Sequence, residues 1–162
     1  MINIYEKAEV GKSLAGLKLG ENLIKFLPSV DRLVNGNTIP WSVNIEHDNK
    51  GVLLYVLPEN NGFIIYVKKP KFELGFTEKG NLCSITAGNG FLGDIFDGGV
   101  KIGSKISQIN HELYLDDTED VHYLIEGDDI IKGILFYAGG LELDEDPNAI
   151  IEEVKVFDFD ID

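Results

Sequence analysis

Much of the chain consists of short segments in which apolar side chains alternate with polar ones. Between residues 41 and 86 the segments rich in β-branched or aromatic residues are Trp41 to Ile45, Gly51 to Leu57, Phe63 to Lys68, Phe72 to Phe76 and Leu82 to Thr86. The stretches that separate them are rich in Gly, Pro, Asn and Asp and have the length of hairpin turns. This spacing predicts an antiparallel meander of short strands.

A second series of strands is expected in the last third of the chain. Its members are Val121 to Ile125, Ile130 to Ala138 and Ile150 to Asp158. The alternation in Met1 to Val10 predicts a further strand at an edge of the sheet. The two series can join into one sheet or stack as a pseudo-dimer.

Each series is preceded by the same short pattern. Gly16 to Phe26 begins Gly-Leu-Lys-Leu-Gly, and Gly99 to Ile109 begins Gly-Val-Lys-Ile-Gly; in both, apolar residues follow at spacings of three. The pattern predicts an entry strand, a glycine of positive φ and a short helix. The first helix is expected from Glu21 to about Val34, restarting at Pro28. The second is expected over residues 105–113 with Ser104 as its N-cap. Coincidence in a Gly-rich chain is the alternative.

These patterns together predict an α+β fold. It is predominantly antiparallel β with two short helical segments, and a helix-plus-meander unit occurs twice. We expect one domain over residues 1–162, with internal units at about 14–97 and 98–162. A chain of 162 residues with 44% hydrophobic content can fold without a disulfide or other cross-link, since chains of this length bury about 70% of their unfolded surface.

The cellular compartment is predicted from what the sequence lacks. The single Cys83 cannot form an internal disulfide, and no run of apolar residues is long enough to cross a membrane. No basic and then apolar leader follows Met1. We therefore expect a protein of the reducing cytoplasm; its oligomeric state is left open.

The charge is strongly uneven along the chain. Residues 1–111 contain 12 Lys and Arg and 11 Asp and Glu, whereas residues 112–162 contain 2 and 17. This excludes nucleic acid and anionic lipid as expected partners and favours a basic protein. The carboxylates occur in three bursts on connections between strands: Asp116, Asp117, Glu119 and Asp120; Glu126, Asp128 and Asp129; and Glu142, Asp144, Glu145 and Asp146. They form either solvated loops or a partner-binding surface.

No pattern of catalytic or cofactor-binding residues is found. Gly88 to Gly93 matches G-x-G-x-x-G, but no helix is expected after it, so we interpret it as a crossover loop. His47, His111 and His122 lack metal-ligand spacing, and the acidic bursts lack the ladder of a calcium loop. Cys83 lies within an alternating strand segment, and we interpret it as a small buried core residue rather than a nucleophile. We expect no enzyme, cofactor or metal; a carboxylate-based enzyme acting on a small molecule or sugar, or a non-catalytic adaptor module, is the alternative.

A resemblance to a known family adds to this interpretation. The chain resembles the immunity proteins of bacterial contact-dependent growth inhibition, whose partners are nuclease toxin domains. The resemblance is carried by Gly16 to Phe26, by the segments Pro70 to Phe76 and Ile134 to Tyr137, and by the acidic last third. It implies a stoichiometric inhibitor of a toxin domain. It also implies binding in which a toxin hairpin extends the sheet of the immunity protein. Apart from the resemblance, Tyr114, Tyr123 and Tyr137 lie near the carboxylates in the sequence and are either core residues or apolar anchors of the interface.

Overall fold

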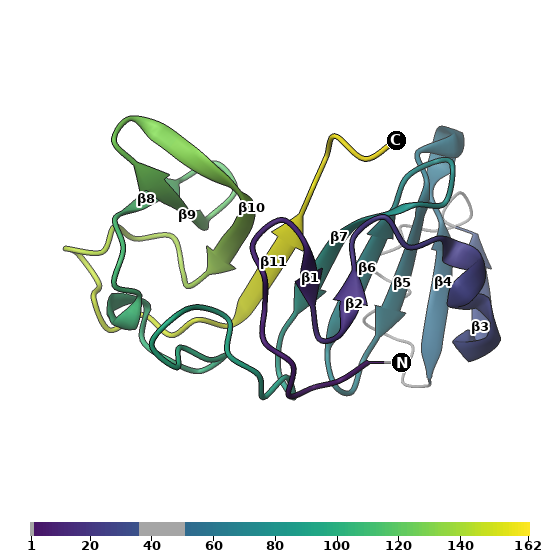
Figure 1. Cartoon of the computed structure of the whole chain (residues 1–162), viewed down its shortest axis with the longest axis horizontal. Helices are drawn as coiled ribbons and strands as arrows, with labels where there is room; N and C mark the ends of the chain where they lie inside the picture. Colours follow the sequence, from purple (N-terminus) through teal and green to yellow (C-terminus); the bar gives the residue numbers. More distant parts are fainter. Residues whose placement is uncertain (1, 36–50) are drawn as a thin grey trace.

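The computed structural model describes residues 2–35 and 51–162, and its main element is one large mixed sheet (Figure 1). The strand order is β3-β4-β5-β6-β7-β11-β10-β9-β8, and all neighbours are antiparallel except β3 and β4. The nine strands are β3 (Arg32–Asn35), β4 (Val52–Val56), β5 (Phe63–Val67), β6 (Phe72–Phe76), β7 (Leu82–Ala87), β8 (Leu113–Asp116), β9 (Val121–Glu126), β10 (Asp129–Tyr137) and β11 (Glu153–Phe157).

The remaining elements are small. A two-stranded ribbon is formed by β1 (Ser13–Leu14) and β2 (Leu17–Lys18). The helices of the described residues are single 3₁₀ turns: η1 (Leu23–Lys25), η2 (Leu27–Ser29), η3 (Pro58–Asn60) and η4 (Ile106–Gln108). The molecule is therefore mostly β, as predicted, and its helical content is smaller than predicted.

The predicted strands of the two series are confirmed wherever the structure describes them. β4, β5, β6 and β7 coincide with the first series to within a residue, and β9 and β10 do so with the second; β11 begins three residues later than predicted. The segment Trp41 to Ile45 lies outside the described residues. The two series join edge to edge in one sheet through β7 and β11.

The predicted helix from Glu21 to Val34 is wrong. The chain makes two 3₁₀ turns, the second containing Pro28, and then extends as β3 parallel to β4. The backbone N–H of Asp31 donates to the carbonyl of Val52 at 2.8 Å, and the N–H of Val52 donates to a carboxylate oxygen of Asp31 at 2.7 Å. Pairing with a neighbouring strand has replaced the local hydrogen bonds on which the helix prediction relied.

Three further local predictions, the second helix, its N-cap and the N-terminal edge strand, are also wrong. The helix expected over residues 105–113 is only η4, and Leu113 already belongs to β8, which pairs with β9. Ser104 does not cap it; its hydroxyl accepts a hydrogen bond from the backbone N–H of Lys101 at 3.0 Å. The described part of the N-terminal segment is not an edge strand. It crosses the sheet, with the N–H of Ala8 donating to the carbonyl of Asp94 at 2.8 Å.

The main core lies on one face of the sheet. Side chains of the strands, such as Ile85, Phe136 and Val154, pack there against residues from the connecting segments, such as Leu17, Ile95 and Ile106, and all six are at most 1% exposed. Figure 1 shows β1 and β2 in front of the sheet, as part of this covering layer. Smaller apolar clusters occur on the opposite face, one near β4 and β5 and another near β9, β10 and β11.

The two similar sequence segments have the same local geometry. Gly16 and Gly99 both have φ of 76°, and Gly20 and Gly103 have φ of 86° and 89°. The N–H of Gly20 donates to the carbonyl of Leu82, and that of Gly103 to the carbonyl of Ile151, both at 2.8 Å. These hydrogen bonds connect each segment to the residues at or just before the start of the last strand of its own series, which is β7 for the first and β11 for the second. Each segment then makes a 3₁₀ turn.

Candidate partner-binding surface

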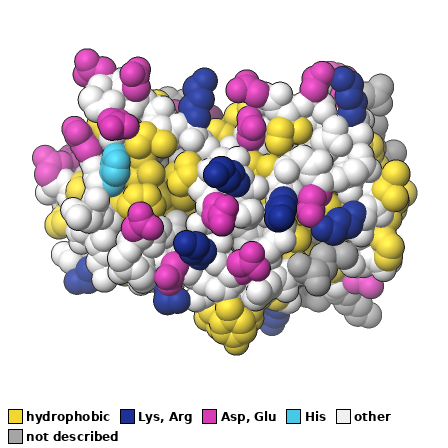
Figure 2. Space-filling view, viewed as in Figure 1, with side chains coloured by type: hydrophobic (Ala, Val, Ile, Leu, Met, Phe, Trp, Pro, Cys, Tyr) yellow, Lys and Arg dark blue, Asp and Glu magenta, His cyan; other side chains and the backbone are white. Residues whose placement is uncertain are grey.

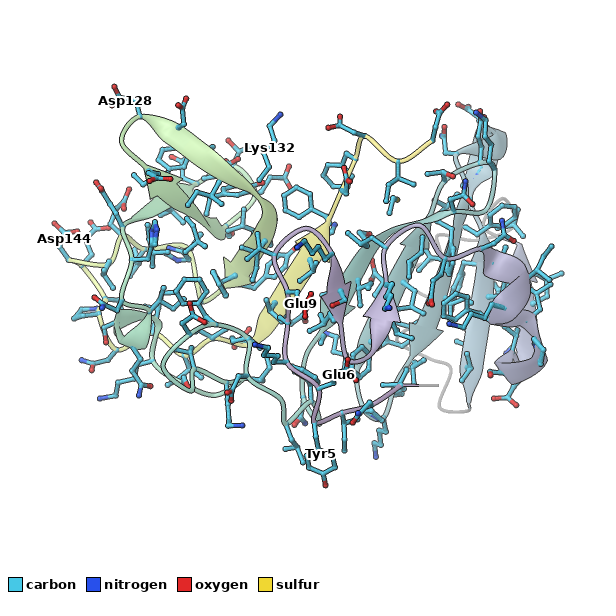
Figure 3. The ribbon with its side chains drawn as sticks, in the orientation of Figure 1. Tyr5, Glu6, Glu9, Asp128, Lys132 and Asp144 are labelled. Atoms are coloured by element: carbon cyan, nitrogen blue, oxygen red, sulfur yellow. The ribbon has the colours of Figure 1, made fainter. Side chains whose placement is uncertain are left out.

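The structure divides the three acidic bursts between the two ends of the β8–β11 strands. The β8–β9 turn and the long connection between β10 and β11 lie at one end, and the β9–β10 turn lies at the other. The six residues of β9 separate the ends, which corresponds to roughly 17 Å. In Figure 3, Asp128 and Asp144 mark the second and third bursts, well apart on this part of the molecule.

The carboxylates of these bursts point mostly into solvent. All are exposed except Asp116 and Asp146, which are partly buried. Among the described residues, none of them forms an ion pair. Three accept hydrogen bonds from backbone N–H groups of their own turns: Asp116 from Thr118 at 3.0 Å, Glu145 from Glu142 at 3.1 Å and Asp146 from Asn148 at 3.2 Å. The charge of the bursts is therefore not neutralised within this part of the protein.

The surface view shows where this charge gathers. In Figure 2 many Asp and Glu side chains lie over the end of the molecule that carries β8, β9 and β10, with apolar surface between them, whereas several Lys side chains lie over the centre. Residues 112–162 contain two cations, Lys132 and Lys155. Lys132 is exposed on β10, and Lys155 is partly buried on β11.

The tyrosines considered as anchors lie on the sheet face opposite the main core. Tyr114 and Tyr123 are directly opposite each other in β8 and β9, and Tyr137 is opposite Glu153. Tyr114 is 48% exposed, and the other two are partly buried. Burial raises the pKa of Tyr123, and the negative charges of Asp116 and Glu119 raise it further. The negative potential of the β8–β9 turn thus reaches the tyrosine face.

A cavity of about 470 Å³ lies beside this face, between the β9–β10 hairpin and the C-terminal residues. It is lined by Gly11, Tyr123, Ile130, Lys132, Gly133, Phe157, Asp158, Phe159 and Asp160. The volume falls within the range of ligand-binding pockets in proteins. Figure 3 labels Lys132, which projects from the hairpin on this side.

The C-terminal wall of the cavity is held by contacts with the β6–β7 region. The backbone N–H of Asp158 donates to the carbonyl of Cys83 at 2.9 Å. Further along, Lys79 pairs with the side chain of Asp162 at 2.8 Å, and the Asn81 side-chain amide donates to the Asp162 carbonyl at 2.6 Å. These contacts keep the C-terminal residues beside the hairpin.

The floor of the cavity is a close approach of two glycines. The N–H of Gly11 donates to the carbonyl of Gly133 at 3.1 Å. Gly133 lies where the register of β10 shifts between Ile130 and Leu135. A Cβ on Gly133 would lie 2.7 Å from the backbone of Gly11, so the absence of a side chain at Gly133 lets the N-terminal loop approach β10 at the cavity.

Charged groups also occupy the centre of this sheet face, outside the cavity. Lys71 forms an ion pair with Glu153, and Glu73 lies nearby on β6. Burial raises the pKa of Glu73, and the charge of Glu153 adds to this effect, whereas Lys155 and Lys71 oppose it. Burial disfavours charged Lys71, but the hydrogen bond and the attraction of Glu153 outweigh burial and raise its pKa. This group ties β6 to β11.

The residues considered for chemistry are scattered. His122 is buried, with Nε2 at 3.2 Å from the carbonyl oxygen of Gly139, and His111 packs edge-on against Phe96 with ring centroids 6.3 Å apart. His47 lies outside the described residues. Cys83 is half-buried, and burial raises the pKa of its thiol, which disfavours the reactive thiolate. Gly88 to Gly93 is a loop, as predicted.

Residues 2–35 and 51–162 contain neither a metal-binding cluster nor a membrane-spanning helix. No group of three or more His, Cys, Asp or Glu side chains is placed to hold a metal ion. No helix there has both the length and the apolar character needed to cross a bilayer.

The sequence identified the carboxylates but not the cavity. Its lining comes from residues near 11, 123–133 and 157–160, so no local pattern marks it. The sequence contains one weak indication of the cavity. Lys155, Phe157 and Phe159 alternate with other residues beyond the end of β11, which places the two phenylalanines of the lining on the same side of the chain.

Comparison with known proteins identifies no relative. No family model, no curated protein and no solved structure matches the chain.

Proposed function

We propose that the protein is a stoichiometric inhibitor of a basic protein domain, namely an immunity protein that neutralises a nuclease toxin of bacterial contact-dependent growth inhibition. The observation that carries this proposal is the set of solvent-exposed carboxylates at the β8–β10 end, which form no ion pairs within the described residues. Such a protein would act in the cytoplasm, where an incoming toxin must be blocked.

The physical basis is electrostatic steering. A nuclease domain is basic because it holds phosphate backbones, and a strongly acidic surface attracts it during diffusion. Complementary charge raises association rates to as much as about 10⁸–10⁹ M⁻¹s⁻¹ at low salt. Apolar contacts in the centre of the interface then supply most of the affinity.

The proposal predicts that the reading frame immediately upstream encodes a toxin whose C-terminal domain binds this protein, and that domain is the partner in the test. The change is Asp116→Asn, Asp117→Asn, Glu119→Gln and Asp120→Asn together. We expect the association rate, measured by stopped-flow fluorescence at low salt, to fall about 10-fold or more, with a flatter dependence on ionic strength. The dissociation rate should change much less, because rim charges act mainly on association.

The matched control removes the same number of charges from exposed carboxylates of the first half. It combines Glu9→Gln, Glu59→Gln, Glu78→Gln and Asp97→Asn. Equal effects of the two sets would contradict a localised acidic binding surface. Absence of any complex with the toxin domain would contradict the proposed function itself.

We further propose that the partner adds a strand to the sheet at β8. This strand lies at one end of the strand order, and the N–H of Ile125 donates to the carbonyl of Glu112 at 3.1 Å. In an antiparallel pair the hydrogen-bonding groups alternate in direction. The backbone groups of Leu113 and Leu115 therefore point away from β9, where an added strand can pair with them.

Leu113→Pro tests this mode of binding. It removes an N–H that points outward from β8 and leaves the bonds to β9 in place. We expect at least about 10-fold faster dissociation of the toxin domain, measured by surface plasmon resonance, because a main-chain bond is left unmade in a buried interface. Leu113→Ala is the control, since it shortens the same side chain and keeps the N–H. Equal dissociation rates for the two variants would contradict strand addition at this edge.

We also infer that the two halves, about residues 14–97 and 98–162, are an internal repeat. The inference is supported by the matching hydrogen bonds of Gly20 and Gly103 and by the register of β7 against β11. In that register Thr86 is opposite Lys155, with Ile85 opposite Val156 and Ala87 opposite Val154. The hydrogen bonds of Gly20 and Gly103 make Leu82 equivalent to Ile151, and by the same offset Thr86 is equivalent to Lys155. Equivalent positions of the two units therefore meet at the Thr86–Lys155 pair, about a local two-fold axis, as expected where two similar units join edge to edge.

A further inference from the structure

We infer that the 470 Å³ cavity beside the β9–β10 hairpin receives a lysine or arginine side chain from the surface of the protein partner. The identity of that partner rests on the function proposed above. The preference of the cavity for a basic side chain follows from its own walls and charges.

The walls suit the long apolar stem of such a side chain. Phe157 and Phe159 are stacked, with ring centroids 4.8 Å apart and planes inclined by 26°. Phe157 is buried, whereas Phe159 is 66% exposed and Ile130 is 43% exposed. Apolar surface left open at the mouth of a cavity is a feature of protein interaction sites. Lysine and arginine place their methylene groups along such surface and keep the charged end at its polar rim.

The charges at the cavity favour a cation. Two of its lining residues, Asp158 and Asp160, carry carboxylates. Two ammonium groups lie at the same cavity, that of the lining residue Lys132 and that of Lys155 near Phe159. The turn that connects β9 and β10 adds Glu126, Asp128 and Asp129 immediately beside Ile130. A positively charged side chain therefore finds net negative charge at the rim, and a negatively charged one is repelled.

An ammonium group already lies near the aromatic wall. Nζ of Lys155 is 5.7 Å from the ring centroid of Phe159, within the range of a cation–π contact. The position of Lys155 shows that this ring accepts a cation in its surroundings. A partner side chain would meet the exposed part of the same ring, with Ile130 on the other side of the mouth.

The occupant is a side chain of a protein rather than a free small molecule because the apolar surface extends beyond the cavity. Tyr114 is 48% exposed and lies directly opposite Tyr123, which lines the cavity. A surface that inserts a basic side chain would cover Tyr114, Ile130 and Phe159 at the same time. Tryptophan, tyrosine and arginine are enriched among the residues that contribute most to the affinity of protein interfaces.

The first experiment uses single capped amino acids as probes. Nα-acetyl-arginine amide and Nα-acetyl-lysine amide are titrated into the protein and followed by NMR of the aromatic rings of Phe157, Phe159 and Tyr123. We expect saturable shifts of these signals at millimolar concentrations. Nα-acetyl-citrulline amide, which has nearly the shape of arginine but no charge, should bind at least about five-fold more weakly. Equal binding of citrulline or of Nα-acetyl-leucine amide would overturn the inference.

Two variants and two controls assign the effect to the cavity. Phe159→Ser and Asp160→Asn should each weaken arginine amide binding. Leu92→Ser and Asp97→Asn make the same kinds of change at exposed positions of the first half and should leave it unchanged. Shifts that persist in Phe159→Ser and Asp160→Asn would place the probe elsewhere and overturn the assignment.

The second experiment uses the upstream-encoded toxin domain and separates this inference from the proposed function. If the domain binds, Phe159→Ser should speed its dissociation about 10-fold or more, with little change in association. Unchanged dissociation would overturn the cavity inference and leave the proposed function standing. If the domain does not bind but arginine amide occupies the cavity, the proposed function fails and the cavity inference is supported.

Discussion

Gly133→Ala is expected to lower the free energy of unfolding by about 2–5 kcal/mol, which is a large part of the stability of a domain of this size. Gly133 has φ of 107°, a conformation that L-residues rarely adopt. A Cβ there would lie 2.7 Å from the Cα and from the nitrogen of Gly11 and 3.3 Å from Cγ1 of Val10. Backbone strain and steric overlap act together, so the N-terminal loop at Gly11 and strand β10 must separate.

Gly127→Ala is the matched control for this prediction. Gly127 is in the same hairpin and has φ of 65°, but a Cβ there has no neighbour within 4 Å. Its cost should be only that of the left-handed backbone, about 1 kcal/mol. Urea denaturation followed by fluorescence gives both values. Similar losses for the two variants would contradict the close approach of Gly11 and Gly133.

Phe136→Ala is expected to cost about 3–5 kcal/mol and to destabilise both halves of the chain together. The ring of Phe136 is fully buried, and it meets the ring of Phe96 edge-on with centroids 6.1 Å apart. Phe136 also belongs to a row of directly opposed residues that runs through Val154 and Ala87 to Phe72. The cavity left by the missing ring therefore lies in a core that the two halves share.

Hydrogen exchange monitored by NMR tests whether the loss is shared. In the Phe136→Ala variant, the slow amides of β5 and β6 should lose protection by the same free energy as those of β9 and β10, since one cooperative domain unfolds as a unit. Phe159→Ala, a change of the same type at an exposed ring, should cost less than about 1 kcal/mol. Retained protection of β5 and β6 in Phe136→Ala would indicate two independent units and contradict the prediction of a single domain.

Most strands of the sheet could be predicted because the residues within each of them alternate between apolar and polar or are rich in β-branched and aromatic types. In β6, for example, Phe72, Leu74 and Phe76 alternate with half-buried residues, and this period of two is visible in the sequence alone. β3 and β8 lacked such a signal. Both follow apolar residues spaced by three, and both exist because a neighbouring strand offers its hydrogen bonds, which is information outside the segment.

The candidate partner-binding surface also has features that the sequence predicts and features that only the structure reveals. Charge is a property of composition, so the carboxylates of residues 112–162 were found without a structure. The separation of Asp128 from Asp144 depends on which turns share an end of the sheet, and that follows only from the strand pairing. The cavity depends on Gly11 meeting Gly133, a contact between distant parts of the chain that no periodicity encodes.

The junction of β7 with β11 also determines how the whole molecule behaves in an electric field. It sets the two halves side by side along the long axis (Figure 1), so the carboxylates on β8, β9, β10 and their connections lie largely toward one end, and the nearly neutral residues 2–35 and 51–97 toward the other. The protein is therefore an electric dipole as well as an anion. A positively charged body exerts a torque on it, and the molecule turns its β8 end forward before the first contact is made.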